Sequence, residues 1–282
     1  MNQDILHKSL NRALNGGAAG SAAMGTQVLS LMWLRTTMNY QYRHGSSTIS
    51  ALKTLYRDGG IPRFYRGLLP ALFQGPLSRF GDTAANSGIM YYLNQNPYTQ
   101  DFNVGTKSFF CSTGAALWRI VIMPIDSIKT NMQVNGKDGL KVLGNKIKTG
   151  GVPVLYNGAV ASSSATFVGH FPWFFTYNYL DHKLPNYEEQ QFLKFVRNGS
   201  IGFSASFISD TCSNSLRVIK TTKQTYNENI SYSKTINIII KKDGLYGLFF
   251  RGLQTRIIAN GLQSSLFIIT WKYFEKKINQ NP

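Results

Sequence analysis

Acidic residues are scarce in this chain. Its 282 residues include 13 Asp and Glu against 30 Lys and Arg, which gives a formal net charge of +17. Charged residues together make up 15% of the sequence, below the roughly 25% of a soluble globular protein. The basic residues are divided among three equivalent loops rather than gathered in one stripe, so we expect no nucleic-acid partner. Positive charge in such a chain instead indicates loops on one side of a membrane, or an anion pathway.

Cysteine is scarce as well, and the motifs of the common enzyme classes are missing. Cys111 and Cys212 lie in apolar stretches of small residues, which predicts two free, buried thiols. The sequence has no CxxC pair and no Cys/His cluster, so we expect no metal site and no cofactor. It has no Walker loop, GxGxxG or Ser/His/Asp set, so we expect no enzyme. The polar N-terminal stretch MNQDILHKSLNRALNGG has no hydrophobic core, so we expect no cleaved secretion signal.

Long hydrophobic runs are few. Ala13–Leu34 contains no charge and is about long enough to span a hydrocarbon core, and Val154–Leu180 is a second such run. Mean hydropathy is −0.16, which is low for a membrane bundle, but helices that line a water-filled cavity need an apolar side only where they meet lipid. Four weaker candidate spans complete the set: Thr83–Gln100, Phe109–Ile128, Asn198–Leu216 and Ile257–Trp271.

Two sequence tags recur three times along the chain. The first reads DGGIPRFYRG at Asp58–Gly67, TGGVPVLYNG at Thr149–Gly158 and DGLYGLFFRG at Asp243–Gly252. A second tag lies upstream of each and keeps its distance to the first, which indicates a true internal repeat. We therefore predict one domain over 1–282, with repeats at approximately 9–100, 101–190 and 191–282. The second tag occupies Ser30–Asn39, Pro124–Gln133 and Ser215–Gln224.

Each repeat predicts a long helix, a loop with a short amphipathic helix, and a second long helix. The loops between the long helices hold 18 of the 30 Lys and Arg residues, whereas the opposite loops hold almost none. By the positive-inside rule the three long loops face one compartment and both termini face the other. The pattern predicts an all-α membrane protein with six transmembrane helices in three pseudo-symmetric repeats. The short helices are expected near Ser47–Arg57, Leu140–Thr149 and Ser233–Lys242.

These tags resemble the two signatures of the mitochondrial carrier family. The first signature is P-x-[DE]-x-x-[KR], and the second is an acidic residue with Gly followed by an aromatic residue, a base and Gly. The middle repeat carries the whole first signature as Pro124, Asp126 and Lys129. In the other repeats the base is kept, but the proline and the acid are replaced: Ser30, Met32 and Arg35 in the first, and Ser215, Arg217 and Lys220 in the third.

The resemblance implies a six-helix barrel in the mitochondrial inner membrane whose central cavity opens alternately to each side. It also implies that prolines kink the odd-numbered long helices, and that ion pairs close the matrix end. Family logic pairs Asp126 with Lys220, Met32 with Lys129, and Arg217 with Arg35, so one ion pair is kept and one pair repels. The expected matrix gate is Arg35, Asp126, Lys129, Arg217 and Lys220, braced by Asn39, Gln133 and Gln224.

The family also implies substrate contacts on the even-numbered long helices, at Gln74, Ala165, Thr166 and Asn260. Charged residues inside the spans add Arg79, Asp82, Arg119, Asp210 and Arg256, because a charge at mid-membrane should face a cavity or a partner. Two other interpretations stay open, a structural ion pair between Arg119 and Asp210 and a local pair between Arg79 and Asp82. His170 is interpreted mainly as a packing residue, and the aromatic run Phe171–Tyr179 mainly as lipid-facing.

The charge balance of these residues favours an anionic or zwitterionic solute. We expect a monomeric secondary transporter, with Arg119 and Arg256 binding the negative group and Gln74 and Asn260 orienting it. The alternative is a non-transporting scaffold or regulatory protein with the carrier fold, because the gate motifs are degraded. Cardiolipin phosphates are expected at the helix starts that follow the first tag, at Tyr65, Arg66, Gly67, Tyr156, Gly158, Phe250, Arg251 and Gly252.

Overall fold

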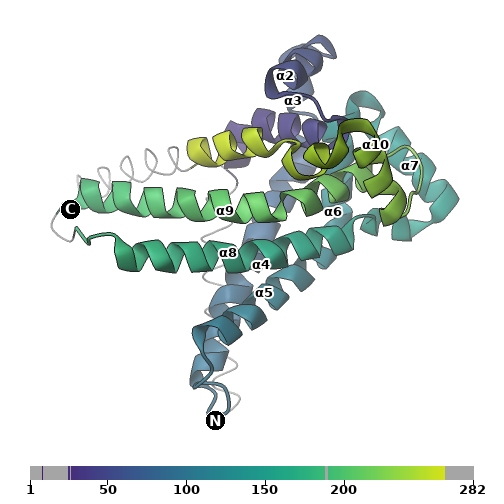
Figure 1. Cartoon of the computed structure of the whole chain (residues 1–282). Coiled ribbons are helices and arrows are strands. Elements are labelled where there is room, and N and C mark those ends of the chain that lie inside the picture. Colours follow the sequence, from purple (N-terminus) through teal and green to yellow (C-terminus); the bar gives the residue numbers. More distant parts are fainter. Residues whose placement is uncertain (1–7, 9–24, 26, 188–189, 264–282) are drawn as a thin grey trace, which may run out of the picture.

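The computed structural model describes residues 8, 25, 27–187 and 190–263, and within them the chain is helical with no strand. Each repeat contains two long helices joined by short ones, as predicted (Figure 1). The first repeat consists of a helix over 27–44, then α2 (Thr48–Arg57), α3 (Gly60–Phe64) and α4 (Leu68–Gln95). The second consists of α5 (Val104–Val121), α6 (Met123–Asn135), η1 (Gly136–Asp138), α7 (Gly139–Gly150), η2 (Val152–Tyr156) and α8 (Ala159–Lys183). The third consists of α9 (Gln191–Thr225), α10 (Tyr232–Phe250) and a helix over 253–263.

Two of the short helices, α2 and α10, begin at a serine that caps them. The Oγ atom of Ser47 accepts a hydrogen bond from the backbone N–H of Ser50 at the start of α2, and Ser231 accepts one from Lys234 at the start of α10. Such caps satisfy amide groups that a helix leaves without partners. The three predicted short helices are confirmed as α2, α7 and α10. The last of them, α10, bends at Gly244, whose φ of 66° suits glycine.

The second long helix of each repeat begins just after a glycine in the left-handed region, namely Gly67, Gly158 or Gly252. Gly67 and Gly158 have φ values of 81° and 86° and immediately precede α4 and α8. The prediction placed the second long helix at Thr83–Gln100, but α4 begins fifteen residues earlier, at Leu68. The apolar pattern missed this half of α4 because Gln74, Arg79 and Asp82 interrupt it, and these side chains line a cavity rather than face lipid.

The middle repeat differs from the other two in having a proline at the first signature position. Pro124 lies in the first turn of α6, and the helical arms on either side of Ile122 meet at a bend of 65°. α9 instead runs unbroken through Ser215, and the first helix continues unbroken through Ser30. Proline lacks a backbone N–H and clashes with the preceding turn, whereas serine does neither. The expected kink of the odd-numbered long helices thus occurs at the repeat that has the proline.

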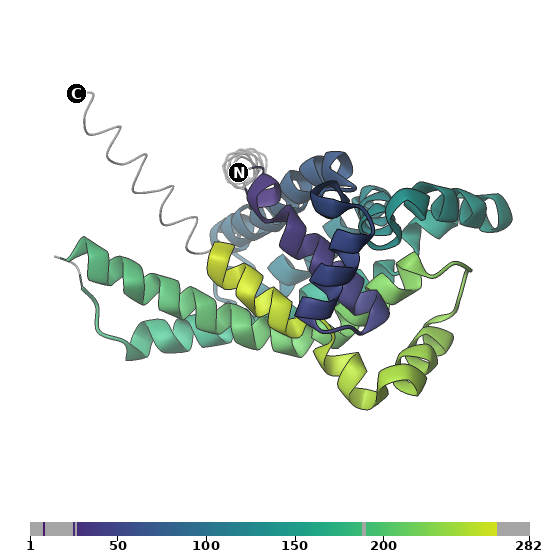
Figure 2. The ribbon, with the colours of Figure 1, turned by 90° about the horizontal axis from the view of Figure 1, so that it is seen from above.

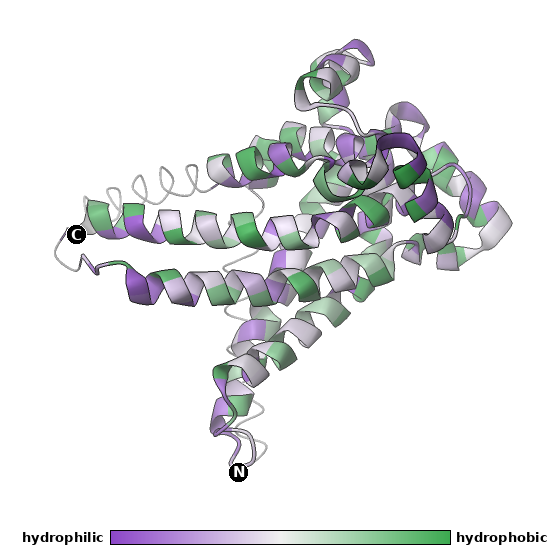
Figure 3. Cartoon of the chain, in the orientation of Figure 1, coloured by the Kyte–Doolittle hydropathy of each residue, from purple (hydrophilic) through white to green (hydrophobic). Residues whose placement is uncertain are grey.

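The outer faces of the long helices are apolar. Leu69, Phe73 and Leu77 are exposed at four-residue intervals on α4, and Phe171 and Phe175 are exposed on α8. Side chains three or four residues apart share one helix face, so these rows form continuous stripes. Figure 3 shows hydrophobic stretches recurring along α8 and α9 and hydrophilic residues on the short helices. Cys111 is buried as predicted, but Cys212 is exposed, because it lies on the outer face of α9, beside the buried Ser213 and Asn214.

The long helices converge where α2, α3, α7 and α10 lie, here called the short-helix end, and spread apart away from it (Figures 1 and 2). Judged by length and hydropathy alone, no single described helix qualifies as a membrane span, whereas the bent pair Val104–Val121 and Met123–Gly150 qualifies when both arms are taken together.

A cation from each repeat binds backbone carbonyl groups at the end of the next repeat's first helix. Arg63 donates to the carbonyls of Gln133 and Val134 at 2.8 and 2.9 Å. Lys146 donates to the carbonyl of Gln224 at 3.0 Å. Arg251 completes the cycle, with a donor 3.4 Å from the carbonyl of Tyr42. Cations are favourable at helix C-termini, where carbonyl groups lack partners, so these contacts join the three repeats at the short-helix end.

Candidate functional site

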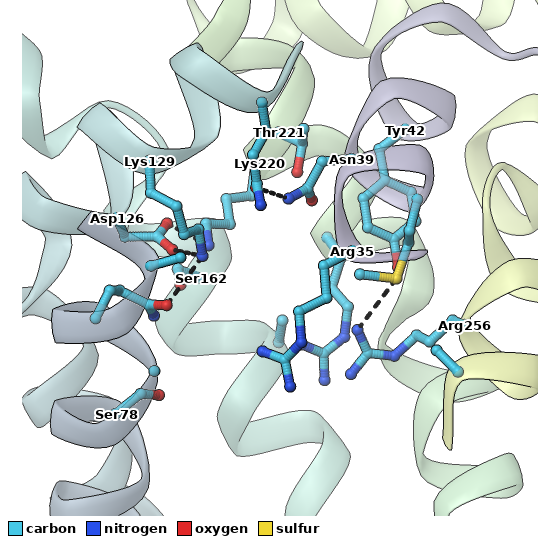
Figure 4. Close-up of a pocket in the computed structure, with 18 of the residues that line it drawn as sticks. Arg35, Asn39, Tyr42, Ser78, Asp126, Lys129, Ser162, Lys220, Thr221 and Arg256 are labelled. Carbon is cyan, nitrogen blue, oxygen red and sulfur yellow. Dashed lines mark hydrogen bonds and ion pairs between the residues drawn. The ribbon is translucent and has the colours of Figure 1, made fainter. Parts of the chain in front are cut away.

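A cavity of about 550 Å³ lies between the repeats. Its lining comes from both long helices of each repeat, and polar side chains from these helices point into it (Figure 4). Seven of the lining residues are cationic, whereas Asp82 and Asp126 are the acidic ones. A low-dielectric wall strengthens the field of such charges, so the cavity attracts anions. The cations are Arg35, Arg79, Arg119, Lys129, Arg217, Lys220 and Arg256.

The boundary between the second and third repeats is closed by ion pairs. Asp126, which is 3% exposed, lies 2.6 Å from Lys220 and 2.8 Å from Lys129. The side-chain amide of Gln224 donates to Asp126 at 3.3 Å and to the hydroxyl of Ser127 at 3.1 Å. A buried carboxylate needs such paired charges and donors to remain ionised.

Further polar contacts reinforce this boundary just outside the cavity. The carbonyl of Gln224 accepts from Asn131 at 3.2 Å as well as from Lys146 at 3.0 Å. Burial, together with the positive charges of Lys223 and Arg43, lowers the pKa of the Lys146 ammonium to about 8. Lys146 thus provides a titratable contact between the second and third repeats.

At the signature positions, neutral groups join the first and second repeats. Asn39 donates to the side-chain oxygen of Gln133 at 2.6 Å, and the amide nitrogen of Gln133 lies 3.4 Å from the sulfur of Met32. Met32 stands at the position of the missing acid, so Lys129 binds Asp126 of its own helix and the side-chain oxygen of Gln74 at 3.0 Å. At the positions of the first signature, this boundary therefore has hydrogen bonds but no inter-repeat ion pair among the described residues.

Positive charge collects at the boundary between the third and first repeats. Arg35, Arg217 and Arg256 line the cavity there, and Figure 4 shows Arg35 and Arg256 pointing toward one another. Asp210 lies behind them, 4% exposed, with Arg256 at 2.6 Å and Arg217 at 3.7 Å. Asn260 also donates to this carboxylate. One carboxylate therefore faces several guanidinium groups.

Helix packing at the boundary between the third and first repeats (the third boundary) also differs from that at the other two boundaries. The repeat glycines Gly67 and Gly158 lie against the backbone carbonyls of Lys129 and Lys220, the bases of the first signature. Gly252 instead lies against the carbonyl of Met38 and the ring of Tyr42. Met38 is three residues beyond Arg35, which is the corresponding base, so the contact is shifted by about one helical turn.

A further ion pair joins two of the helices that line the cavity. Arg119 of α5 binds Asp82 of α4 at 2.5 Å. Both alternative pairings that the sequence left open are therefore absent, since Asp210 binds Arg256 and Arg217 instead. Arg79 is exposed to the cavity and forms no ion pair among the described residues. It is available to a solute without breaking a structural contact.

Most of the predicted substrate residues meet in this cavity. Gln74, Arg79, Asp82, Arg119, Ala165, Thr166, Arg256 and Asn260 line it, and Asp210 supports Arg256 from behind. Sequence reasoning missed Ser78, Ser162 and Thr221, which also line it. Helix periodicity contained the signal for two of them, because Ser78 lies midway between Gln74 and Asp82, and Ser162 lies one turn before Thr166.

Residues predicted to bind lipid headgroups fall into two groups. Tyr156 and Phe250 are exposed, and Gly67 and Gly158 begin helices whose N-termini have no side-chain cap. Arg251, in contrast, is 6% exposed and lies 2.7 Å from Asp243. Its guanidinium group therefore joins helices within the protein. The remaining residues of the set are Tyr65, which packs against a buried apolar cluster, Arg66 and Gly252.

At the opposite end of the cavity, Asp181 binds Arg197 at 2.7 Å across the α8–α9 turn. His170 is half-buried, lies 3.1 Å from the hydroxyl of Ser112 and does not line the cavity, as a packing residue would. Of the aromatic run, Phe171, Phe175 and Tyr179 stack in a row on the outer face.

Comparison with known proteins agrees with this architecture. The model of the family described as mitochondrial carrier protein matches residues 7–96, 100–188 and 191–282. Mitochondrial substrate carrier family protein C of Dictyostelium discoideum is 24% identical over 98% of this chain and 60% of its own length. The mitochondrial thiamine pyrophosphate carrier 1 of Meyerozyma guilliermondii is 23% identical over 77% of this chain and 76% of its own.

Human mitoferrin-1 is 25% identical over 56% of this chain and 49% of its own length. This chain thus matches between about half and three-quarters of the length of these relatives. Members of the matching family are transporters of small solutes rather than enzymes. Because the family model covers nearly every residue in three consecutive matches, the chain belongs to the mitochondrial carrier family.

Proposed function

We propose that this protein is a multi-pass transporter of the mitochondrial inner membrane that carries a small anionic or zwitterionic metabolite through the central cavity. The observation that carries the proposal is the cavity itself, which is enclosed by three repeats, lined by seven cations and closed at the short-helix end by Asp126 and Lys220. Alternating access requires a polar site between repeats that can be sealed from either side.

The arrangement of donors suggests how such a solute would bind. Arg79 and Arg119 approach from α4 and α5, and Arg256 approaches from the helix over 253–263. Gln74 and Asn260 carry amides that can orient polar atoms of the solute. Guanidinium groups bind carboxylates and phosphates with two parallel hydrogen bonds, so each arginine offers a geometric match to an anionic group.

The apolar outer stripes of α4 and α8 support a location within lipid, and the uncapped helix starts at Gly67 and Gly158 support phosphate binding at the membrane surface. We propose cardiolipin headgroups at these starts and a monomeric carrier domain over 1–282, with no nucleic-acid partner. We orient the protein with the short-helix end facing the matrix, because the loops at that end hold most of the positive charge.

Uptake into liposomes by the purified protein tests the proposal. A panel of labelled anions and amino acids is offered to protein with and without internal exchange substrate, and uptake above empty liposomes is expected for at least one solute. Arg79→Gln should lower that uptake about tenfold or more, because a hydrogen bond to a charged group is worth roughly 1.5–3 kcal/mol. The thermal unfolding midpoint should stay unchanged, since Arg79 forms no ion pair among the described residues.

Arg57→Gln provides the matched control, because Arg57 is exposed on α2 and does not line the cavity. Arg119→Ala should abolish uptake but also lower the midpoint, because Asp82 loses its partner. If no solute of a broad panel is taken up by folded protein, the transport proposal fails, and a scaffold built on the carrier fold becomes the better explanation.

A further inference from the structure

The third gate position has the wrong charge for direct closure. Asp126 and Lys220 link the second and third repeats by an ion pair. The corresponding positions of the third and first repeats hold Arg217 and Arg35, two cations where an acid and a base would attract each other. Like charges in the partly buried wall of a cavity repel more strongly than they do in bulk water, so this boundary needs a source of negative charge to close as the other one does.

Negative charge from the chain itself is insufficient among the described residues. Asp210 lies two helical turns before Arg217 on α9, where it binds Arg256 at 2.6 Å and Arg217 at the longer distance of 3.7 Å. Arg256 lies close enough to both Arg35 and Arg217 to repel them. The cluster of Arg35, Arg217, Arg256 and Asp210, here called the arginine cluster, therefore carries three positive charges and one negative charge.

The three arginines of the arginine cluster line the cavity, and Arg256 uses its Nε to bind Asp210. One terminal nitrogen of Arg256 has the sulfur of Met38 as its neighbour at 3.9 Å, and a thioether is a weak acceptor. Arg217 directs its Nε toward Ser213 at 3.3 Å, which leaves terminal nitrogens toward Asp210 and the cavity. The three guanidinium groups approach from three separate helices. Such an arrangement matches an oxyanion with several acceptor oxygens better than a planar carboxylate with two.

We infer that the arginine cluster is a binding subsite for a phosphate group, and that the bound phosphate links Arg217 of the third repeat to Arg35 of the first. A doubly charged phosphate neutralises the excess charge of the cluster. It thereby takes the place of the missing acid and completes the closure of the matrix end. The inference rests on the proposed transport function for this consequence, whereas the binding of phosphate is independent of transport.

Two sources could provide the group, namely free inorganic phosphate and a phosphate ester on the transported solute. The first experiment measures the thermal unfolding midpoint of the purified full chain in detergent, with sodium phosphate, glycerol phosphate, succinate or sodium chloride at equal ionic strength. Phosphate or the phosphate ester should raise the midpoint saturably, by roughly 5 °C at 100-fold excess over Kd. A response to both identifies the free anion as sufficient, and a response to the ester alone identifies the solute as the source.

Variants of Arg217 separate specific binding from general salt effects. Arg217→Gln should abolish the phosphate response, because the bridging donor is lost. Arg217→Glu should raise the midpoint without phosphate and also abolish the response, because the new carboxylate supplies the missing acid opposite Arg35. Arg57→Gln, outside the cavity, should keep the full response. Arg35→Gln provides a second test from the other side of the boundary and should behave like Arg217→Gln.

Three outcomes would overturn the inference. If phosphate and its ester stabilise the protein no more than chloride does, or if succinate does so equally well, the subsite is not a phosphate site. If Arg217→Gln and Arg35→Gln keep the response, the phosphate binds elsewhere. The readout requires no uptake, so a protein that responds to phosphate but transports nothing retains this subsite and refutes transport. A protein that transports a solute but shows no response to phosphate retains the transport function and refutes the phosphate subsite.

Discussion

At the boundary between the second and third repeats, Asp126 binds Lys220 at 2.6 Å and Gln224 donates to the same carboxylate. At the boundary between the third and first repeats, the equivalent residues are Arg217 and Arg35. The first of these boundaries is complete without a ligand, whereas the second holds excess positive charge. The contrast shows that threefold pseudosymmetry of the backbone does not require threefold symmetry of the forces that close it.

The largest effect is expected from breaking the complete boundary. Asp126→Asn leaves Lys129 and Lys220 without their shared counter-charge, and loss of one partner of a buried ion pair costs about 3–5 kcal/mol. The thermal unfolding midpoint should fall markedly, and liposome uptake should be lost. The double variant Asp126→Asn with Lys220→Gln should recover part of the stability, because the uncompensated lysine is removed.

Asp101→Asn is the matched control for this experiment, since Asp101 is exposed between α4 and α5. An unchanged midpoint in Asp126→Asn would show that the two lysines do not depend on this carboxylate, and the comparison between the boundaries would lose its basis.

A second effect concerns the backbone rather than the charges. Ser215→Pro introduces into α9 the proline that the first signature has at this position, but α9 runs through residue 215 without a break. The substitution removes a helical hydrogen bond and causes a clash with the preceding turn, at a cost of about 3 kcal/mol. Pro124→Ser should cost only about 0.4–1 kcal/mol, through greater freedom of the unfolded chain. Unfolding midpoints of both variants test this asymmetry, and equal losses would contradict it.

The repeat pattern, the short helices and the family were predictable from the sequence, because tags such as DGGIPRFYRG recur at fixed spacing in contexts that leave one interpretation. The extent of α4 was not predictable from hydropathy, since Gln74 and Asp82 interrupt the apolar run while Leu69 and Phe73 keep an outward stripe. The partners of the ion pairs could not be predicted from the sequence either. Whether Arg119 binds Asp210 or Asp82 depends on how far apart the helices lie, and no local spacing encodes that separation.

The glycine shift at the third boundary illustrates the same limit. The sequence aligns Gly252 with Gly67 and Gly158, yet Gly252 packs one turn further along the neighbouring helix. Shape complementarity between two helices decides such a register, and it depends on every side chain at the contact. Motif spacing alone therefore identifies which residues correspond, but not how closely their environments agree.

Two glutamines extend the comparison between the boundaries, and their substitution should have smaller effects on stability. Gln224 donates to the ionised Asp126, whereas Gln133 exchanges hydrogen bonds with the neutral Asn39 and Met32. Hydrogen bonds to charged groups contribute about 1.5–3 kcal/mol and neutral ones about 0.5–1.5 kcal/mol. Gln224→Leu should therefore lower the unfolding midpoint more than Gln133→Leu. The reverse order would mean that Gln133 rather than Gln224 braces the principal closure of the matrix end.

The smallest expected effect is a dependence on pH that is confined to the complete boundary. Lys146 donates to the carbonyl of Gln224, and its pKa is lowered to about 8 in the folded protein from 10.5. Between these two values the unfolded chain binds more protons than the folded one, so folding becomes more favourable as pH rises. From pH 8 to pH 9 this group should add about 1 kcal/mol to the free energy of unfolding.

Lys146→Met removes this titration while keeping a long side chain, and Lys148→Met is the control on the exposed side of the same helix. The difference in unfolding midpoint between wild type and Lys146→Met should shift in favour of wild type from pH 8 to pH 9, while the difference for Lys148→Met stays constant. Parallel pH profiles for all three proteins would show that Lys146 keeps an ordinary pKa. The short-helix contact between the second and third repeats would then be insensitive to pH, as the contact that Arg251 makes with Tyr42 at the third boundary should be, because a guanidinium group keeps its charge throughout this range.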